Sequence, residues 1–276
     1  NVLAMLEKLG KKTAFIGKVG QDLFGNKLKA TLDEVGIDTS NLIIDEDART
    51  TLAFVETFPD GDRDFSFYRN PGADMMLRKE DLHEDLIRDA KIFHYGTLSM
   101  THDGVREATK KAIDIAKESG AILSFDPNLR PMLWKSQEIM ARVINDAAQY
   151  ADIVMPGLNE GRILTGMDNE KDIAGYYLQR GVQTVVIKMG GSHGTYIRTA
   201  DGQEYRVPSY HVDHIVDTVG AGDGFAVGFT SAILDGLNLE DAARRGAAIG
   251  AMAIQVAGDN EGLPTRAQLE AFQQNA

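Results

Sequence analysis

A single acid, Asp223, stands in the glycine- and alanine-rich stretch DTVGAGDG, just before a long apolar segment. That segment predicts a helix, and the first backbone N–H groups of a helix lack intrahelical partners, so they can bind an anion such as phosphate. Gly220, Ala221 and Gly222 leave room for the anion. The carboxylate would then remove a proton from an alcohol that attacks the phosphorus. The alternative is structural: Asp223 caps the helix and the glycines form a turn.

The composition excludes several other kinds of chemistry. The chain has 276 residues, 43% hydrophobic and 25% charged, which is ordinary for a globular protein. It has no cysteine, so disulfides and thiolate-bound metals are excluded, and its six histidines lack metal-binding spacing. No GxxxxGK(S/T) loop is present, which excludes a P-loop nucleotide site.

The charge and hydropathy of the chain limit the kinds of partner and the cellular location that we expect. A net charge of −12 argues against a nucleic-acid binder, which needs a basic face. We find no apolar run of about 18 residues, so we expect no membrane span, and no signal-peptide pattern opens the chain. The absence of cysteine fits a reducing, cytoplasmic location, which we expect for this protein. Because the first residue is Asn1 rather than Met, we expect the chain to begin within a longer protein.

Short apolar strands alternate with helical segments along most of the chain. The strands are continuous and aliphatic, which is typical of strands buried on both faces. Their alternation with helices predicts a parallel sheet that helices cover on both sides. We expect strands at 12–20, 91–96, 121–126, 152–156 and 184–190, and helices at 22–36, 104–120, 136–150, 171–181, 222–236 and 239–258. In the first helix, Asp22 is a candidate N-cap and Gly36 a C-terminal stop.

One segment, residues 49–70, interrupts this alternation. Its sequence has two strands of alternating polarity around Pro-Asp-Gly-Asp at 59–62, which predicts a hairpin. A hairpin inserted into an α/β domain can serve as a lid over a site. It can also be a simple edge hairpin, and the pattern alone does not decide between the two.

The stretch DTVGAGD, residues 217–223, resembles the C-terminal signature (D/N)-T-x-G-A-G-D of the ribokinase-like (PfkB) carbohydrate kinases at every position. Asn1, Gly10 and Gly20 fit the spacing of the N-terminal signature, although Leu3 departs from the small residue usual there. The resemblance covers essentially the whole chain. It implies an α/β fold of three α/β/α layers, with a mostly parallel sheet and a small β-strand lid.

The resemblance also implies the organisation of the domain. Residues 1–48 and 72–276 would form the α/β core that binds nucleotide and sugar, and residues 49–71 would form part of the lid. The remaining lid strands would lie before residue 1. Lid strands of this family often pair between subunits, so a homodimer through the lid is one expectation.

In this family the acid of the GAGD loop is the base that activates the sugar hydroxyl, which implies that role for Asp223. Gly220, Ala221 and Gly222 would form the anion hole for the γ-phosphate, and Asn1 would bind the sugar.

The resemblance implies a site for ATP and Mg²⁺ as well. The family's N-x-x-E motif aligns with 157–160, where Glu160 matches the Glu that supports the Mg²⁺–phosphate network and Gly157 replaces the Asn. Lys188, Gly190 and Gly194 match the segment that binds the ATP phosphates and ribose. The Mg²⁺ would arrive largely with ATP and keep many of its waters. In some relatives a monovalent cation such as K⁺ lies beside the loop of Asp217, which makes it a further candidate cofactor.

Two segments favour fructose as the sugar. Residues 67–77, FYRNPGADMML, resemble fructokinases, and 124–134, SFDPNLRPMLW, are shared by fructokinases and 2-keto-3-deoxygluconate kinases. Their Arg69 and Arg130 are substrate or phosphate candidates, because guanidinium presents fixed, paired donors. Surface salt bridges are the alternative for both arginines.

Two other segments, 156–166 and 257–269, resemble 2-keto-3-deoxygluconate kinases more closely. Because the lid and the sugar contacts come mainly from the N-terminal half, we expect ATP-dependent phosphorylation of fructose to fructose 6-phosphate, with 2-keto-3-deoxygluconate as the alternative substrate. A sugar-sensing protein without catalysis is a different class, which the intact GAGD loop argues against. A nucleoside kinase would require a more apolar, aromatic pocket for the base in place of the two arginines.

Overall fold

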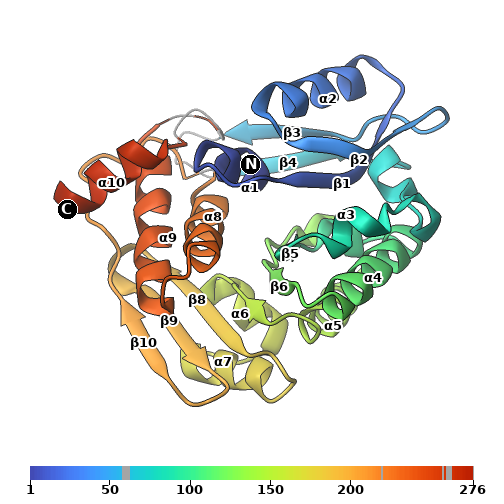
Figure 1. Ribbon diagram of the computed structural model, residues 1–276. Coiled ribbons are helices and arrows are strands. Elements are labelled where there is room, and N and C mark those ends of the chain that lie inside the picture. Colours follow the sequence, from blue (N-terminus) through green and yellow to red (C-terminus); the bar gives the residue numbers. More distant parts are fainter. Residues whose placement is uncertain (58–62, 219, 257, 259–262, 276) are drawn as a thin grey trace.

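The structure of the chain is a computed structural model that describes residues 1–57, 63–218, 220–256, 258 and 263–275 (Figure 1). The turn expected at 59–62 lies outside the described residues. None of the helices in the described part of the chain is long and apolar enough to cross a membrane.

A six-stranded sheet forms the centre of the molecule, with the strand order β10-β9-β8-β7-β6-β5. Strands β5 to β8 are parallel, as the apolar runs predict, while β9 and β10 add an antiparallel edge that was not predicted. The bounds are β5 (Ile92–Tyr95), β6 (Ile122–Phe125), β7 (Ile153–Val154), β8 (Thr184–Gly190), β9 (Gly194–Thr199) and β10 (Glu204–Val207).

Helices cover both faces of this sheet because successive strand side chains point in opposite directions. Val154 and Val185 lie in one buried cluster with side chains of α4, α5, α6 and α7. Their neighbours Ile153 and Val186 lie in a second cluster with α8 and α9. The predicted three-layer α/β/α arrangement is therefore confirmed. The bounds are α4 (Asp103–Glu118), α5 (Gln137–Ala148), α6 (Leu158–Thr165), α7 (Glu170–Leu178), α8 (Ala221–Leu234) and α9 (Leu239–Ala253).

Two small sheets and α2 (Leu23–Val35) make up the upper, blue part of the molecule in Figure 1. The strand expected at 12–20 is present as β1 (Ala14–Gly20), but it pairs in parallel with β2 (Asp38–Asp45) instead of joining the six-stranded sheet. The hairpin expected at 49–70 is confirmed as the antiparallel pair β3 (Leu52–Thr57) and β4 (Arg63–Tyr68).

The expected caps of α2 are both present. Asp22 Oδ1 accepts a hydrogen bond from the Gly25 N–H at 2.9 Å, and Gly36 adopts the left-handed conformation with φ 97°. The apolar side chains of this helix are nevertheless exposed, with Leu23 at 79% and Phe24 at 51%. Helical spacing thus identified the helix correctly without identifying a buried face.

The remaining α-helices of the described residues are α1 (Val2–Lys8), α3 (Glu84–Arg88) and α10 (Arg266–Asn275). Helix α1 packs on α8, α3 on α4 and α10 on α9. Helices α8 and α9 approach closely through glycines, since a Cβ atom at Gly228 would lie 2.6 Å from the Arg245 carbonyl oxygen and from Gly246 Cα. Small residues at this crossing fix the position of α8 in the fold.

Candidate active site

The start of α8 presents the loop that the sequence singled out. Gly220 is the N-cap of this helix and has φ 76°, a left-handed conformation that favours glycine. Asp223 lies in the first turn, whose backbone N–H groups have no intrahelical partners, although the Ala221 N–H donates to the Thr218 carbonyl at 3.5 Å. Asn1, the predicted sugar ligand, donates from Nδ2 to Asp223 Oδ2 at 3.1 Å. Two predicted site residues from opposite ends of the chain therefore meet.

Lys188 lies on the other side of this loop. A Cβ atom at position 222 would be 3.8 Å from Lys188 Nζ, so the ammonium group faces the first turn of α8. The same Nζ donates to Asp126 Oδ2 at 2.6 Å. Burial alone would lower the pKa of Lys188, but the negative charges of Asp126 and Glu160 together have the larger effect, so the pKa of Lys188 is raised. The group is therefore a cation that faces the first turn of α8.

Asp126, just beyond the end of β6, is a site residue that the sequence did not single out. Its Oδ1 is buried and has no hydrogen-bond partner among the described residues. Burial raises the pKa of Asp126 to about 6, against the opposing charge of Lys188. The pair is thus ionised at neutral pH and begins to protonate on mild acidification. The only sequence signal was its position after an apolar strand, where side chains reach the carboxyl edge of a sheet.

Glu160 occupies a structural position beside this pair. Its Oε2 accepts from the Gly157 N–H at 2.7 Å at the start of α6, and its Oε1 accepts from the Leu129 N–H at 2.8 Å. The carboxylate thereby joins the start of α6 to the loop that follows β6. It also adds negative potential at Asp126 and Lys188.

His94, on β5, lies near the same group and remains neutral. Its Nδ1 is 3.0 Å from Ser124 Oγ. Burial lowers the pKa of His94 to about 4, although the charge of Asp223 raises it. This histidine therefore adds no charge to the site near neutral pH.

The charges of the site fit a Mg²⁺ ion bound to phosphates. The carboxylates of Asp126, Glu160 and Asp223 all act on the charge of Lys188, and among the described residues Asp126 Oδ1 has no hydrogen-bond partner. Within the part of the chain that the structure describes, no three acidic or imidazole groups converge closely enough to hold a metal alone. An ion that brings its own phosphate and water ligands matches this incomplete set.

The turn between β8 and β9 contains the two glycines expected to contact the nucleotide. Gly190 and Gly194 both have positive φ, 69° and 68°. A Cβ atom on Gly194 would lie 2.2 Å from the Val207 carbonyl oxygen, so packing alone requires this glycine. Gly190 has open space at its Cβ position and lies at the carboxyl end of β8, two residues after Lys188.

The structure separates the two arginines that were expected to contact substrate. Arg69 is buried, and its guanidinium donates to Asp74 Oδ2 at 2.7 Å, Thr101 Oγ1 at 2.7 Å and the Leu98 carbonyl at 3.0 Å. Every nitrogen of its guanidinium donates to a protein acceptor, which favours the structural alternative for this residue.

Arg130 lies where the core meets the hairpin. Its Nη1 donates to Asn128 Oδ1 at 2.8 Å and to the Leu129 carbonyl at 2.9 Å. Its guanidinium carbon is 5.2 Å from the centre of the Phe65 ring on β4, within cation–π range. Arg130 therefore links the loop after β6, which begins with Asp126, to the hairpin.

A helix N-terminus that offers an anion site and a carboxylate together suits the small-molecule kinases of the ribokinase-like class. The chain belongs to the pfkB family of carbohydrate kinases, because the model of that family matches residues 1–266.

Individual relatives are similar along nearly the whole chain. The 2-dehydro-3-deoxygluconokinase of Bacillus subtilis (strain 168) is 39% identical over 99% of this chain and 84% of that protein. Fructokinase-1 of Oryza sativa subsp. japonica is also 39% identical, over 100% of this chain and 87% of that protein. The fructokinase from Vibrio cholerae O395, solved with fructose, ADP and calcium ion, superposes with a TM-score of 0.89 at 28% identity and covers 99% of this chain and 89% of that one.

Proposed function

We propose that this carbohydrate kinase transfers the γ-phosphate of ATP to the primary hydroxyl of fructose, giving fructose 6-phosphate. The observation that carries the proposal is the arrangement at the start of α8. The first turn of α8 supplies the carboxylate of Asp223 and the backbone N–H groups, and it faces the partly buried Lys188, whose Nζ is 3.8 Å from the Cβ position of residue 222. Each of these groups has a separate task in phosphoryl transfer.

Asp223 is the proposed general base. Its carboxylate removes the proton from the sugar hydroxyl as that oxygen attacks the phosphorus, which contributes a rate factor of about 10² to 10⁴. Asn1 contacts the same carboxylate, so a sugar that binds Asn1 is brought next to the base.

The N–H groups of Gly220, Ala221 and Gly222 are the proposed anion hole for the transferred phosphoryl group. Lys188 neutralises charge on its oxygens from the opposite side, and Asp126 orients the ammonium group. Mg²⁺ bound to ATP supplies further charge neutralisation when present. We propose Asp126, with Glu160 behind it, as the protein side of that metal site, and Gly190 with Gly194 as the turn beside the nucleotide.

We propose that residues 49–71 act as a lid over the sugar, above a core of residues 1–48 and 72–276. Support comes from the contact between Phe65 of the hairpin and Arg130 of the core. On the other face of the hairpin Phe54 and Tyr68 are exposed at 57% and 68%. That exposed face supports a homodimer through the lid. The double mutant of the fructokinase from Vibrio cholerae O395, solved with fructose, ADP and potassium ion, supports a monovalent cation such as K⁺ as a further cofactor, and we propose the surroundings of Asp217 as its site.

A second candidate substrate is 2-keto-3-deoxygluconate, the sugar acid. The Bacillus subtilis relative favours it with an identity equal to that of the rice fructokinase. Arg130 could pair with the carboxylate of such a sugar, because guanidinium binds carboxylates in a bidentate manner.

The test is sugar-dependent release of ADP from MgATP, with fructose and 2-keto-3-deoxygluconate measured side by side, and ribose and adenosine as controls. We expect the highest kcat/KM with fructose. A higher value with the sugar acid would select the second candidate. No sugar-dependent ADP from any of the four would argue against the proposed function and for a sugar sensor.

A further inference from the structure

Helix α1 is attached to α8 near both of its ends. At one end Asn1 Nδ2 donates to Asp223 Oδ2 at 3.1 Å. At the other end the Lys11 ammonium donates to Asp235, which is the C-cap of α8. The two aspartates are twelve residues apart, about 18 Å along a helix. Between these attachments, apolar side chains of α1 pack against α8 and α9 in one buried cluster, which includes Met5, Leu6, Leu9, Val227, Ala248 and Ile249.

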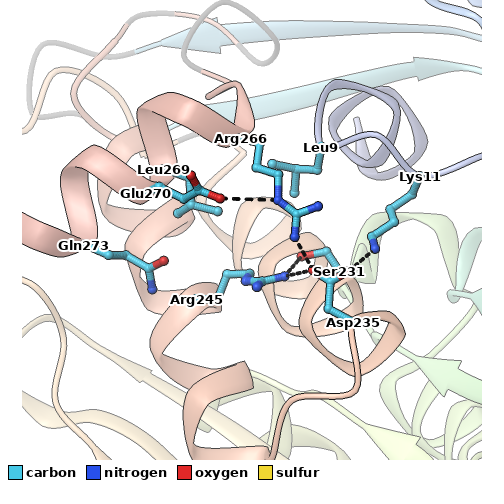
Figure 2. A pocket seen from close by; sticks show the side chains of 9 residues that line it. All are labelled: Leu9, Lys11, Ser231, Asp235, Arg245, Arg266, Leu269, Glu270 and Gln273. Atoms are coloured by element: carbon cyan, nitrogen blue, oxygen red, sulfur yellow. Dashed lines mark hydrogen bonds and ion pairs between the residues drawn. The ribbon is translucent and has the colours of Figure 1, made fainter.

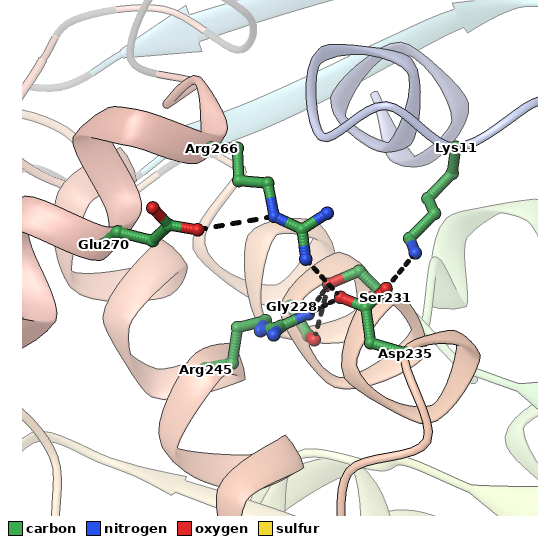
Figure 3. A network of polar contacts seen from close by, with 7 residues as sticks. All are labelled: Lys11, Gly228, Ser231, Asp235, Arg245, Arg266 and Glu270. Atoms are coloured by element: carbon green, nitrogen blue, oxygen red, sulfur yellow. Dashed lines mark hydrogen bonds and ion pairs between the residues drawn. The ribbon is translucent and has the colours of Figure 1, made fainter.

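The attachment at Asp235 is part of a cluster of three cations around one carboxylate (Figures 2 and 3). Besides Lys11, Arg245 of α9 donates from Nη1 at 2.6 Å, and Arg266 at the start of α10 donates from Nη2 at 2.8 Å. Side chains from α9, from the start of α10 and from the segment that follows α1 therefore meet at the C-terminal end of α8. The cavity beside it is about 20 Å³, which suits one water molecule and is too small for a metabolite.

Hydrogen bonds hold the backbone around Lys11 against α1, so the Lys11 ammonium group moves together with that helix. Gly10 is left-handed with φ 77°, and its N–H donates to the Glu7 carbonyl at 2.8 Å. The Lys11 N–H donates to the Leu6 carbonyl at 2.9 Å. The Glu7 side chain in turn accepts from the Thr13 N–H at 2.7 Å. A shift of α1 along α8 would therefore separate Lys11 from Asp235.

We propose that Lys11 and Asp235 are positioning residues for the phosphoryl transfer: their ion pair sets the place of α1 along α8 and so holds the Asn1 amide against Asp223. This inference rests on the proposed function, in which Asn1 binds the sugar and Asp223 is the base. The pair acts through Asn1 and does not contact the reacting groups.

Because three cations bind Asp235, a substitution of Lys11 can test positioning without unfolding the protein. If Lys11 loses its charge, Arg245 and Arg266 still neutralise Asp235, and the C-terminal end of α8 keeps the cations that its dipole favours. The fold should therefore survive while α1 loses its attachment. Arg266 contacts the same carboxylate from α10, which makes it a matched control for the loss of one charge.

The test compares Lys11→Met with Arg266→Met in the protein with MgATP and fructose. We expect Lys11→Met to raise the KM for sugar about three- to tenfold, the effect of weakening one hydrogen bond at the substrate, with kcat nearly unchanged. Arg266→Met should leave KM unchanged, and Lys11→Arg should restore it. An unchanged KM in Lys11→Met, or equal increases in both methionine variants, would overturn the inference.

A double-mutant cycle identifies the route of the effect. In an Asn1→Ala background, Lys11→Met should change KM by less than about 1.5-fold, because the contact through which it acts is gone. If Lys11→Met raises KM by the same factor in the Asn1→Ala background as in wild type, the two residues act independently, which would contradict positioning through Asn1. Hydrogen exchange supplies a readout without turnover: the amides of Met5 and Leu9 should exchange faster in Lys11→Met than in Arg266→Met. A wild-type protein that turns over no sugar would remove the proposed function, and the exchange result would still test the attachment.

Discussion

The two ends of α8 carry the same type of side chain in opposite surroundings. At the N-terminal end, the carboxylate of Asp223 is bordered by glycines and accepts a hydrogen bond from the neutral amide of Asn1. At the C-terminal end, Asp235 is bound by Lys11 and two arginines. Partial burial raises the pKa of Asp235, but the hydrogen bonds from Lys11 and Arg245 lower it to about 2.

In the proposed function, this difference lets α8 be anchored at one end while its other end carries the general base. A carboxylate surrounded by cations is a poor base, because its negative charge is already stabilised. Asp223 instead accepts a hydrogen bond from a neutral amide, and the space at the Cβ position of Gly222 beside it is where we propose that the phosphate binds. Lys11, Arg245 and Arg266 therefore bind a carboxylate that is about 18 Å along α8 from Asp223, the proposed base.

The largest effect expected from a change in the surroundings at the reactive end comes from Gly222→Ala. The added methyl group would lie 3.8 Å from Lys188 Nζ, in the space proposed for the phosphate. Misplacing the phosphate by about 1 Å should lower kcat by roughly 10²-fold, with no loss of stability. Gly175→Ala in α7 is the matched control, because its Cβ would also have its nearest neighbour, Arg198 Nη1, at 3.8 Å. Equal turnover in the two variants would contradict the anion hole.

A pH profile of Asp126→Asn tests the charges near the reactive end. Burial raises the pKa of Asp126 to about 6, so acidification below about pH 6 protonates it and removes the partner of Lys188. We expect wild-type kcat/KM to fall on the acid side with an apparent pKa near 6. Asp126→Asn should be about tenfold slower or more at neutral pH and lack that acid limb. Asp235→Asn should retain the limb; if Asp126→Asn also retains it, another group is responsible.

The smallest effect concerns stability at the anchored end. The pKa of Asp235 is about 2 in the folded protein against an ordinary 3.8, so its contribution is complete above about pH 4 and is lost as the pH falls through about 2. At pH 7 we expect Asp235→Asn to melt about 2–4 °C lower, as for a loss of about 1 kcal/mol in a chain of this size. This difference should shrink toward pH 2 in thermal melts. A constant difference would show that the cations do not act through the charge of Asp235.

The layered core could be predicted because its cause is local. The continuous apolar runs of β5 to β8 reflect burial on both faces, and the intervening helices have the matching period. The place of β1 could not be predicted in the same way. Its sequence resembles those strands, yet it pairs with β2, whose sequence was not identified as a strand. Strand partners depend on tertiary packing, which a single segment does not encode.

The candidate site was predictable where chemistry depends on a local motif. The GAGD loop identified Asp223 and its glycines, and the structure places Asn1 and Lys188 beside them. Asp126 was missed because its importance comes from Lys188, 62 residues away in the sequence. Arg69 was predicted as a substrate ligand because the sequence does not show its protein partners, Asp74, Thr101 and the Leu98 carbonyl, which come together only in the fold.

The most direct test of the central claim is kcat for fructose-dependent ADP release by Asp223→Asn at saturating MgATP, beside wild type. Thermal melting and ATP binding would confirm that the variant is folded. If the carboxylate at the reactive end of α8 is the base, kcat falls by about 10²- to 10⁴-fold while melting and ATP binding are retained. A variant that keeps wild-type turnover would contradict the account, because no proton acceptor would then be needed at Asp223.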